Sequence, residues 1–146
     1  MNRIEYIKYI FGSIFLLSNK LQVLGDQYLG REGISTKQWF LMVMISQFQS
    51  NLPTLSQVAE LMGSSRQNVK QLALKLDEKG FVDIQKDKKD ARVLTLALTE
   101  KSKLFWEERE NQDDQFLLDL FKDFTPEEII NMNNGFNKLF SKIEKL

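Results

Sequence analysis

The most constraining feature of the sequence is a pair of short helical patterns separated by a glycine. Thr54 and Gln57 have the spacing of a capping box, and Gly63 is the residue type that commonly ends a helix. Ser65 offers a second cap, and Gly80 closes the next helix after about fourteen residues. Apolar side chains recur in both segments at i, i+3, i+4 and i+7, at Leu55, Val58, Ala59 and Met62 and then at Val69, Leu72, Ala73 and Leu76. This pattern predicts a helix-turn-helix.

Two alternating segments follow the second helix. Val82 and Ile84 alternate with polar residues, and the later apolar positions are Leu94, Leu96 and Leu98. Period-two alternation predicts two strands, each with one buried face, and the polar segment KDKKDA predicts the tip between them. A helix-turn-helix followed directly by a two-stranded hairpin is a winged helix.

The two ends of the chain carry long apolar stripes. Steps of three and four predict an N-terminal helix of about six turns, with its stripe at Ile4, Ile7, Phe11, Ile14, Leu17, Leu21 and Leu24. Ser35 and Gln38 predict the cap of a second, largely buried helix, and Thr125, Pro126 and Glu128 predict the start of a last one. The last helix carries Ile129, Met132, Phe136, Leu139 or Phe140, and Ile143.

Between the hairpin and the last helix, residues 107–115 show no apolar face. A helix that is polar all round usually crosses solvent between two packed regions. The terminal stripes could pack on each other within one monomer, but we expect them to interdigitate in a two-fold homodimer. The predicted architecture is therefore mainly α with a small β-hairpin wing. Residues 1–35 and 116–146 form its dimerisation region, and residues 36–115 form the winged helix-turn-helix lobe with its connecting helix.

The composition excludes several function classes. The 146 residues include no cysteine and no histidine, so disulfides, Cys/His zinc sites, thiol redox sensing and histidine acid–base catalysis are impossible. Carboxylates are present but show no clustered metal-binding spacing. We expect no enzyme activity, no metal and no cofactor. The longest uncharged N-terminal run, Tyr9 to Asn19, is too short for a membrane span and lacks a small-residue cleavage site, which favours a cytoplasmic protein.

Charge is separated along the chain although the formal net charge is +0. Residues 64–92 contain eight basic and five acidic side chains, whereas residues 100–123 contain four basic and eight acidic ones. A basic segment on a neutral protein indicates a local surface for an anionic partner.

The second helix of the predicted motif has a polar outer face. Any surface helix is polar outside, but this face carries no carboxylate before Asp77 and has three amides in its first two turns. Such side chains pair with base edges and phosphates. The candidate DNA-contacting residues are Ser65, Arg66, Gln67, Asn68, Lys70, Gln71 and Lys75. Leu74, on or near this face, would contact a thymine methyl group or pack against the hairpin or the first helix of the motif.

The predicted hairpin tip adds Lys88, Lys89, Asp90 and Arg92 to the candidate site. Hairpin tips are often charged because they are solvated. A carboxylate two residues before an arginine can also clamp and aim its guanidinium. An aimed arginine suits the narrow, electronegative minor groove of A·T-rich DNA.

Two stretches, LSQVAELMGSSRQNVKQLALKLDEKGFV and DARVLTLALTEKS, resemble the MarR family of winged-helix transcriptional regulators. The first is similar to the family's helix-turn-helix and recognition helix, and the second to its Asp-x-Arg wing signature. The resemblance implies a homodimer with the helix from Arg66 in the major groove and the wing in the minor groove, where Asp90 orients Arg92. It also implies release of DNA when a small, often phenolic or anionic, effector binds between the dimer region and the winged lobe.

Two departures from the family pattern affect these expectations. Without cysteine, the peroxide-sensing mechanism of one branch cannot operate. At the wing, Lys88 stands where proline is frequent and Ala91 where a second arginine is usual, so we expect a looser tip and weaker minor-groove anchoring.

The leading interpretation is a dimeric double-stranded-DNA-binding regulator, most simply a ligand-responsive repressor that binds a pseudo-palindromic operator. The alternative is a winged helix that binds a partner protein. The effector-binding residues stay unassigned, because aromatic side chains on apolar stripes are more often core than binding site. The aromatic candidates are Tyr6, Phe11, Phe15, Trp39, Phe40, Phe48 and Trp106.

Overall fold

The computed structural model describes residues 1–49 and 51–146. Their elements are, in order, α1 (Arg3–Leu29), η1 (Gly30–Glu32), α2 (Thr36–Ser46), α3 (Leu55–Met62), α4 (Arg66–Glu78), β1 (Val82–Lys86), β2 (Leu94–Leu98), α5 (Glu100–Leu120) and α6 (Pro126–Glu144). The mainly α fold with a β-hairpin is confirmed. The chain divides into two compact units, Met1–Leu104 and Phe105–Leu146. The first unit therefore holds α1 together with the winged helix, while the dimerisation role of residues 1–35 and 116–146 stays a prediction.

The predicted helix starts are confirmed by side-chain caps. The side chains of Ser35, Thr54 and Thr125 each accept a bond from the backbone N–H three residues on, and each is part of a complete capping box. Ser65 caps α4 through its hydroxyl, which accepts from the N–H of Asn68 at 3.1 Å. α1 also begins at a complete capping box, formed by Asn2 and Glu5, which was not predicted from the sequence.

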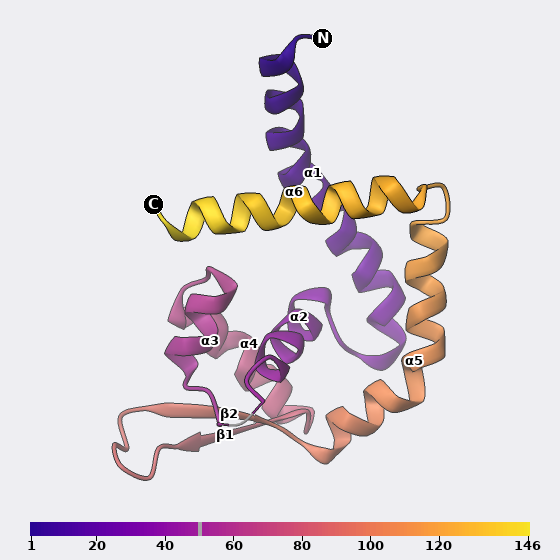
Figure 1. Cartoon of the computed structure of the whole chain (residues 1–146). Helices are drawn as coiled ribbons and strands as arrows, with labels where there is room; N and C mark the ends of the chain where they lie inside the picture. Colours follow the sequence, from indigo (N-terminus) through magenta and orange to yellow (C-terminus); the bar gives the residue numbers. More distant parts are fainter. Residues whose placement is uncertain (50) are drawn as a thin grey trace. The chain divides into compact units, whose positions relative to one another are not determined.

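The core of the first unit lies where α2, α3 and α4 pack against the hairpin (Figure 1). One side chain from each of these elements, Leu41, Val58, Leu76 and Leu96, is fully buried. Apolar burial of this kind stabilises the fold by about 1.5–3 kcal/mol per large side chain. Gly63 joins α3 to α4 with a φ of 67°, a left-handed conformation that glycine adopts without steric cost. The predicted helix-turn-helix is thereby confirmed.

The hairpin pairs β1 with β2 in antiparallel register, from Val82 opposite Leu98 to Lys86 opposite Leu94. The expectation of a single buried face is wrong at Thr95, which is buried. The physical reason is a third segment along β2: Thr54 forms a bridge with Thr95, and the N–H of Leu96 donates to the carbonyl of Pro53 at 3.0 Å. β2 therefore lies between β1 and residues 53–54, so its outer edge is paired.

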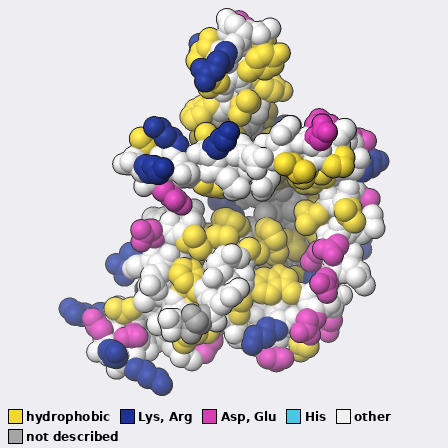
Figure 2. All heavy atoms as spheres, in the orientation of Figure 1, with side chains coloured by type: hydrophobic (Ala, Val, Ile, Leu, Met, Phe, Trp, Pro, Cys, Tyr) yellow, Lys and Arg dark blue, Asp and Glu magenta, His cyan; other side chains and the backbone are white. Residues whose placement is uncertain are grey.

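The apolar stripe of α1 is largely exposed. Ile7, Phe11 and Leu21 are all exposed, and Figure 2 shows hydrophobic side chains over the part of α1 that contains the N-terminus. Within the second unit, the stripe of α6 is exposed as well, at Ile129, Met132, Phe136, Leu139, Phe140 and Ile143. In the part of the chain that the structure describes, no helix is both long and apolar enough to span a membrane.

α5 departs from the expectation that residues 107–115 are polar and solvated all round. Arg109 is only 6% exposed. Its Nη2 atom pairs with Oδ1 of Asp113 at 3.2 Å, and its guanidinium lies 5.1 Å from the ring centroid of Phe105. A buried arginine is tolerated because these groups replace part of its hydration. One face of α5 is therefore buried at Arg109, which a count of polar residues does not reveal.

Candidate nucleic-acid interface

α4 presents its polar face because its opposite face is anchored in the core. Val69, Ala73 and Leu76 are completely buried. Their spacing of four and three residues places them on one side of the helix, so the outer side is turned to solvent. The seven predicted contact residues of this helix are all exposed: Ser65, Arg66, Gln67, Asn68, Lys70, Gln71 and Lys75. The structure thus leaves all seven accessible on the outer side of α4, which carries no carboxylate before Asp77.

Asn68 has a local structural role that the sequence analysis missed. Its Nδ2 atom donates to the hydroxyl of Ser64 at 2.8 Å, while its backbone N–H donates to Ser65. Both bonds shape the first turn of α4. Gln67 and Gln71 are therefore better placed than Asn68 to pair with a base, because reading adenine requires both the amide donor and the acceptor.

Leu74 lies on this surface and is 45% exposed. It is seven residues from Gln67 and three from Gln71, so the three side chains share one side of the helix. That Leu74 contacts a thymine methyl group, or packs against the hairpin or the first helix of the motif, stays a prediction. An exposed aliphatic side chain beside amides can contact a thymine methyl group.

The hairpin tip is held by Asp87, which closes the turn without proline. Its Oδ2 atom accepts from the backbone N–H groups of Lys89 and Asp90, both at 3.1 Å. The backbone of Asp87 also donates to the carbonyl of Val93 at 2.8 Å. These bonds brace the tip. A looser tip was expected because Lys88 stands where proline is frequent in the family pattern.

Asp90 grips Arg92 as the Asp-x-Arg spacing predicted. Oδ1 of Asp90 accepts from Nε of Arg92 at 3.1 Å and from its backbone N–H at 3.0 Å, while Oδ2 accepts from Nη2 at 3.2 Å. The Arg92 side chain is 91% exposed. The side-chain and backbone bonds from Arg92 lower the pKa of Asp90 below its ordinary value, so the carboxylate stays charged at neutral pH. The guanidinium is thus held by two bonds to Asp90 and remains open to a ligand.

The two predicted probes belong to one unit, because α4 packs against β1. Lys88, Lys89 and Arg92 are exposed, and Figure 2 shows Lys and Arg side chains gathered at the projecting end of the hairpin. The polar outer side of α4 and the basic hairpin tip could therefore contact the same extended anion.

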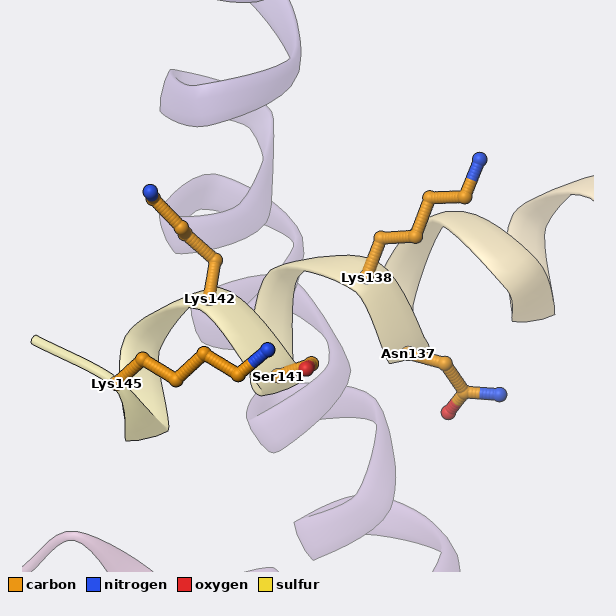
Figure 3. Close-up of a pocket in the computed structure, with 5 residues that line it drawn as sticks. All are labelled: Asn137, Lys138, Ser141, Lys142 and Lys145. Carbon is orange, nitrogen blue, oxygen red and sulfur yellow. The ribbon is translucent and has the colours of Figure 1, made fainter.

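The C-terminal helix has an open depression that we do not assign as a site. It is lined by four residues of α6, Asn137, Lys138, Ser141 and Lys142, and by Lys145, which follows the helix. Figure 3 shows Lys138 and Lys142 extending away from each other, so their ammonium groups do not converge on one ligand. The described residues also contain no group of three or more acidic side chains that could hold a metal ion. The aromatic candidates for an effector crevice stay unassigned.

One residue outside the predicted set has well-defined polar contacts. Lys79, which follows α4, donates from Nζ to Gln38 and to the carbonyl of Gly33. The sequence offered no signal for this contact, because its partners are more than 40 positions away.

No family model matches the chain. A curated relative, the transcriptional activatory protein BadR of Rhodopseudomonas palustris, is 24% identical over 106 residues, which cover 72% of this chain and 61% of that protein. The match thus spans less than two thirds of the length of BadR.

Solved structures match over nearly the whole chain. A MarR/EmrR family transcriptional regulator from Acinetobacter sp. ADP1 has a TM-score of 0.79 at 20% identity and covers 95% of this chain and 97% of its own. The S. aureus MepR–DNA complex has a TM-score of 0.77 at 20% identity, with 94% and 97% covered. The fold and the hairpin define a winged helix-turn-helix protein. Its fold is that of the MarR-family transcriptional regulators, which confirms the resemblance found in the motifs.

Proposed function

We propose that this protein is a homodimeric, sequence-specific transcriptional regulator of the MarR type that binds double-stranded DNA. The observation that carries the proposal is the bidentate Asp90–Arg92 pair on an exposed wing. A solvated arginine of no function gains little from such a brace, because exposed ion pairs contribute little to stability. An arginine that enters a narrow minor groove gains direction and loses less conformational freedom on binding.

The α4 surface complements the wing. A helix of this kind enters the major groove, where amides read adenine and lysines or arginines contact guanine or phosphate. In our proposal Gln67 and Gln71 read bases, Arg66, Lys70 and Lys75 contact bases or phosphates, and Ser65 and Asn68 set the start of the helix. Lys88 and Lys89 neutralise phosphates beside Arg92. The solved MepR–DNA complex, which shares this fold, supports a DNA-binding role.

Dimerisation is proposed from the exposed apolar faces of α1 and α6. Side chains such as Phe11 and Phe136 are exposed along stripes that a soluble chain ordinarily covers. A second copy offers an identical stripe, and two-fold association is the commonest oligomeric arrangement. Residues 1–35 and 116–146 would form that region. Two recognition helices then meet half-sites about one turn apart, near 34 Å.

The direction and control of regulation are part of the same proposal. We assign repression of a nearby operon, relieved by a small aromatic or anionic effector, and cytoplasmic localisation, with no catalytic role. This part rests on the family resemblance. The curated relative BadR is named as an activatory protein, so repression must be tested separately. A reporter gene downstream of the bound DNA would be silenced by a repressor and induced by an activator.

The decisive experiment is selection of bound fragments from a random double-stranded DNA pool at physiological salt. We expect enrichment of an inverted repeat, because each protomer presents the same α4 to its half-site. Arg92→Ala should weaken binding about equally for all enriched sequences, while Gln71→Ala should change the preferred base at one position. No enrichment, together with a partner protein whose binding survives both substitutions, would replace this proposal with the protein-interaction alternative.

A further inference from the structure

Lys79 makes contacts that a solvated surface lysine does not need. Its Nζ atom donates to Oε1 of Gln38 at 2.9 Å and to the backbone carbonyl of Gly33. Gln38 is a buried polar residue with only 6% exposure. A charged donor that bonds to a buried amide oxygen is among the stronger hydrogen bonds in a protein. The end of α4 is therefore tied to the segment that joins α1 to α2.

Gln38 is itself held rigidly. Its Oε1 atom also accepts from the backbone N–H of Ser35 at 3.2 Å, and its own N–H donates to the hydroxyl of Ser35 at 3.1 Å. This is the capping box that begins α2. The same oxygen thus serves the cap of α2 and the ammonium of Lys79, so a shift of α4 along α2 would break a partly buried bond.

The start of α2 is in turn fixed to α1. The N–H of Thr36 donates to Oδ1 of Asp26 at 2.7 Å, and its hydroxyl donates to the carbonyl of Gln22 at 3.0 Å. Gly25 allows this approach, because a Cβ at that position would lie 2.3 Å from the hydroxyl oxygen of Thr36. A continuous set of short contacts therefore runs from α1 through the start of α2 to the end of α4.

We propose that Lys79 and Gln38 are positioning residues that fix the angle of α4 against α1 and thereby set the half-site spacing that the protein accepts. The inference rests on the proposed function, in which α1 belongs to the dimer region and α4 enters DNA. Neither residue is assigned a contact with DNA. Their effect is exerted through the geometry of the dimer, because the separation of two recognition helices depends on how each is held against the dimer region.

The test uses the full-length protein and a panel of the selected inverted repeat with its spacer lengthened or shortened one base pair at a time. Wild type should prefer one spacing. Gln38→Met and Lys79→Met should each reduce that preference by about tenfold, the factor expected for loss of one hydrogen bond to a charged group. The double variant should lose less preference than the product of the two single effects, because both substitutions remove the Lys79–Gln38 bond.

Two measurements separate positioning from other effects. Gln38→Met leaves every charge in place, so its salt dependence should equal that of wild type while its spacing preference falls. Lys37→Met is the matched control: Lys37 is exposed and adjacent to Gln38, and its loss should leave spacing preference unchanged. Thermal unfolding identifies any variant that fails to fold. If Gln38→Met unfolds, Lys79→Met still tests the proposal, because Lys79 is only half-buried.

The outcomes distinguish this inference from the proposed function. If wild type enriches no inverted repeat, the proposed function fails and the spacing role fails with it. If wild type has a sharp spacing preference that both variants retain within about twofold, the positioning role is refuted while DNA binding stands. A loss of preference in Lys79→Met alone, with a reduced salt dependence, would also refute positioning and would make Lys79 a phosphate contact instead.

Discussion

The substitution Asp90→Asn separates two accounts of the wing by the sign of its effect on DNA affinity. If the tip acts only through its charge, removing a carboxylate beside DNA should strengthen binding. If Asp90 aims Arg92, binding should weaken. In the structure Oδ2 of Asp90 accepts from Nη2 of Arg92 at 3.2 Å. An asparagine with Oδ1 retained as the acceptor would place an amide donor at that position, so the bidentate grip would be lost.

The size of the expected loss of affinity follows from the conformational freedom that Arg92 regains in Asp90→Asn. Immobilising a side chain with many rotamers on binding costs about three- to tenfold in affinity. The Arg92 side chain is 91% exposed, so little besides Asp90 restricts it before DNA arrives. The opposing gain from a lost surface charge is smaller, about twofold at physiological salt. We therefore expect Asp90→Asn to weaken binding by about threefold net.

The assay is fluorescence anisotropy with the selected DNA at fixed ionic strength. Asp83→Asn is the control, because it removes the same charge from the same hairpin at an exposed position of β1 away from the tip. It should leave affinity unchanged or slightly raise it. In an Arg92→Ala background, Asp90→Asn should no longer weaken binding, since there is no guanidinium to aim. Tighter binding by Asp90→Asn in the wild-type background would refute the brace.

Other predictions address the charge, pH response, specificity and stability of the same lobe. Arg92→Ala should reduce the slope of log affinity against log salt by about 0.9, as for one phosphate contact, and an unchanged slope would place Arg92 away from the backbone. Because Arg92 lowers the pKa of Asp90, the brace is present above that pKa and lost only as pH falls through it, so the affinity ratio of wild type to Asp90→Asn should be constant between about pH 6 and pH 8. Replacing operator thymines by uracil one at a time should weaken wild-type binding about threefold at a position contacted by Leu74, and Leu74→Ala should be insensitive to that change. Val69→Ala should lower the free energy of unfolding by about 2 kcal/mol in urea titration, because Val69 is fully buried, whereas Gln67→Ala should stay within about 0.5 kcal/mol.

The winged helix could be predicted from the sequence because its signals are local. A cap at Thr54, a left-handed glycine at Gly63 and a cap at Ser65 each act within one turn of helix, and the structure contains all three. The Asp90–Arg92 brace is also local, since its partners are two positions apart. Hydrophobic periodicity and residue pairs a few positions apart predict helix ends, turns and local ion pairs reliably.

The features that were not predicted depend on a third segment, on partners far along the chain or on polar contacts that leave no apolar stripe. Thr95 is buried because residues 53–54 pair with β2, and alternation within the hairpin cannot reveal that neighbour. Arg109 was expected to be solvated, yet Asp113 and Phe105 accompany it on one face of α5. Its spacing of four residues from each was visible in the sequence, but an ion pair and a ring contact do not register as an apolar stripe.

The contact between Gly25 in α1 and Thr36 in α2 is one that joins residues distant in the sequence. A glycine inside a helix costs roughly 1 kcal/mol relative to alanine, and at Gly25 this cost accompanies a close contact. Thr36 supplies it, because its side chain occupies the space that a Cβ would need. Since α1, α2 and the end of α4 are bonded in series, we expect a displacement of α1 in the proposed dimer region to be passed to α4. Under the proposed function, a change in DNA affinity that originates in α1 would reach α4 through Thr36, Gln38 and Lys79.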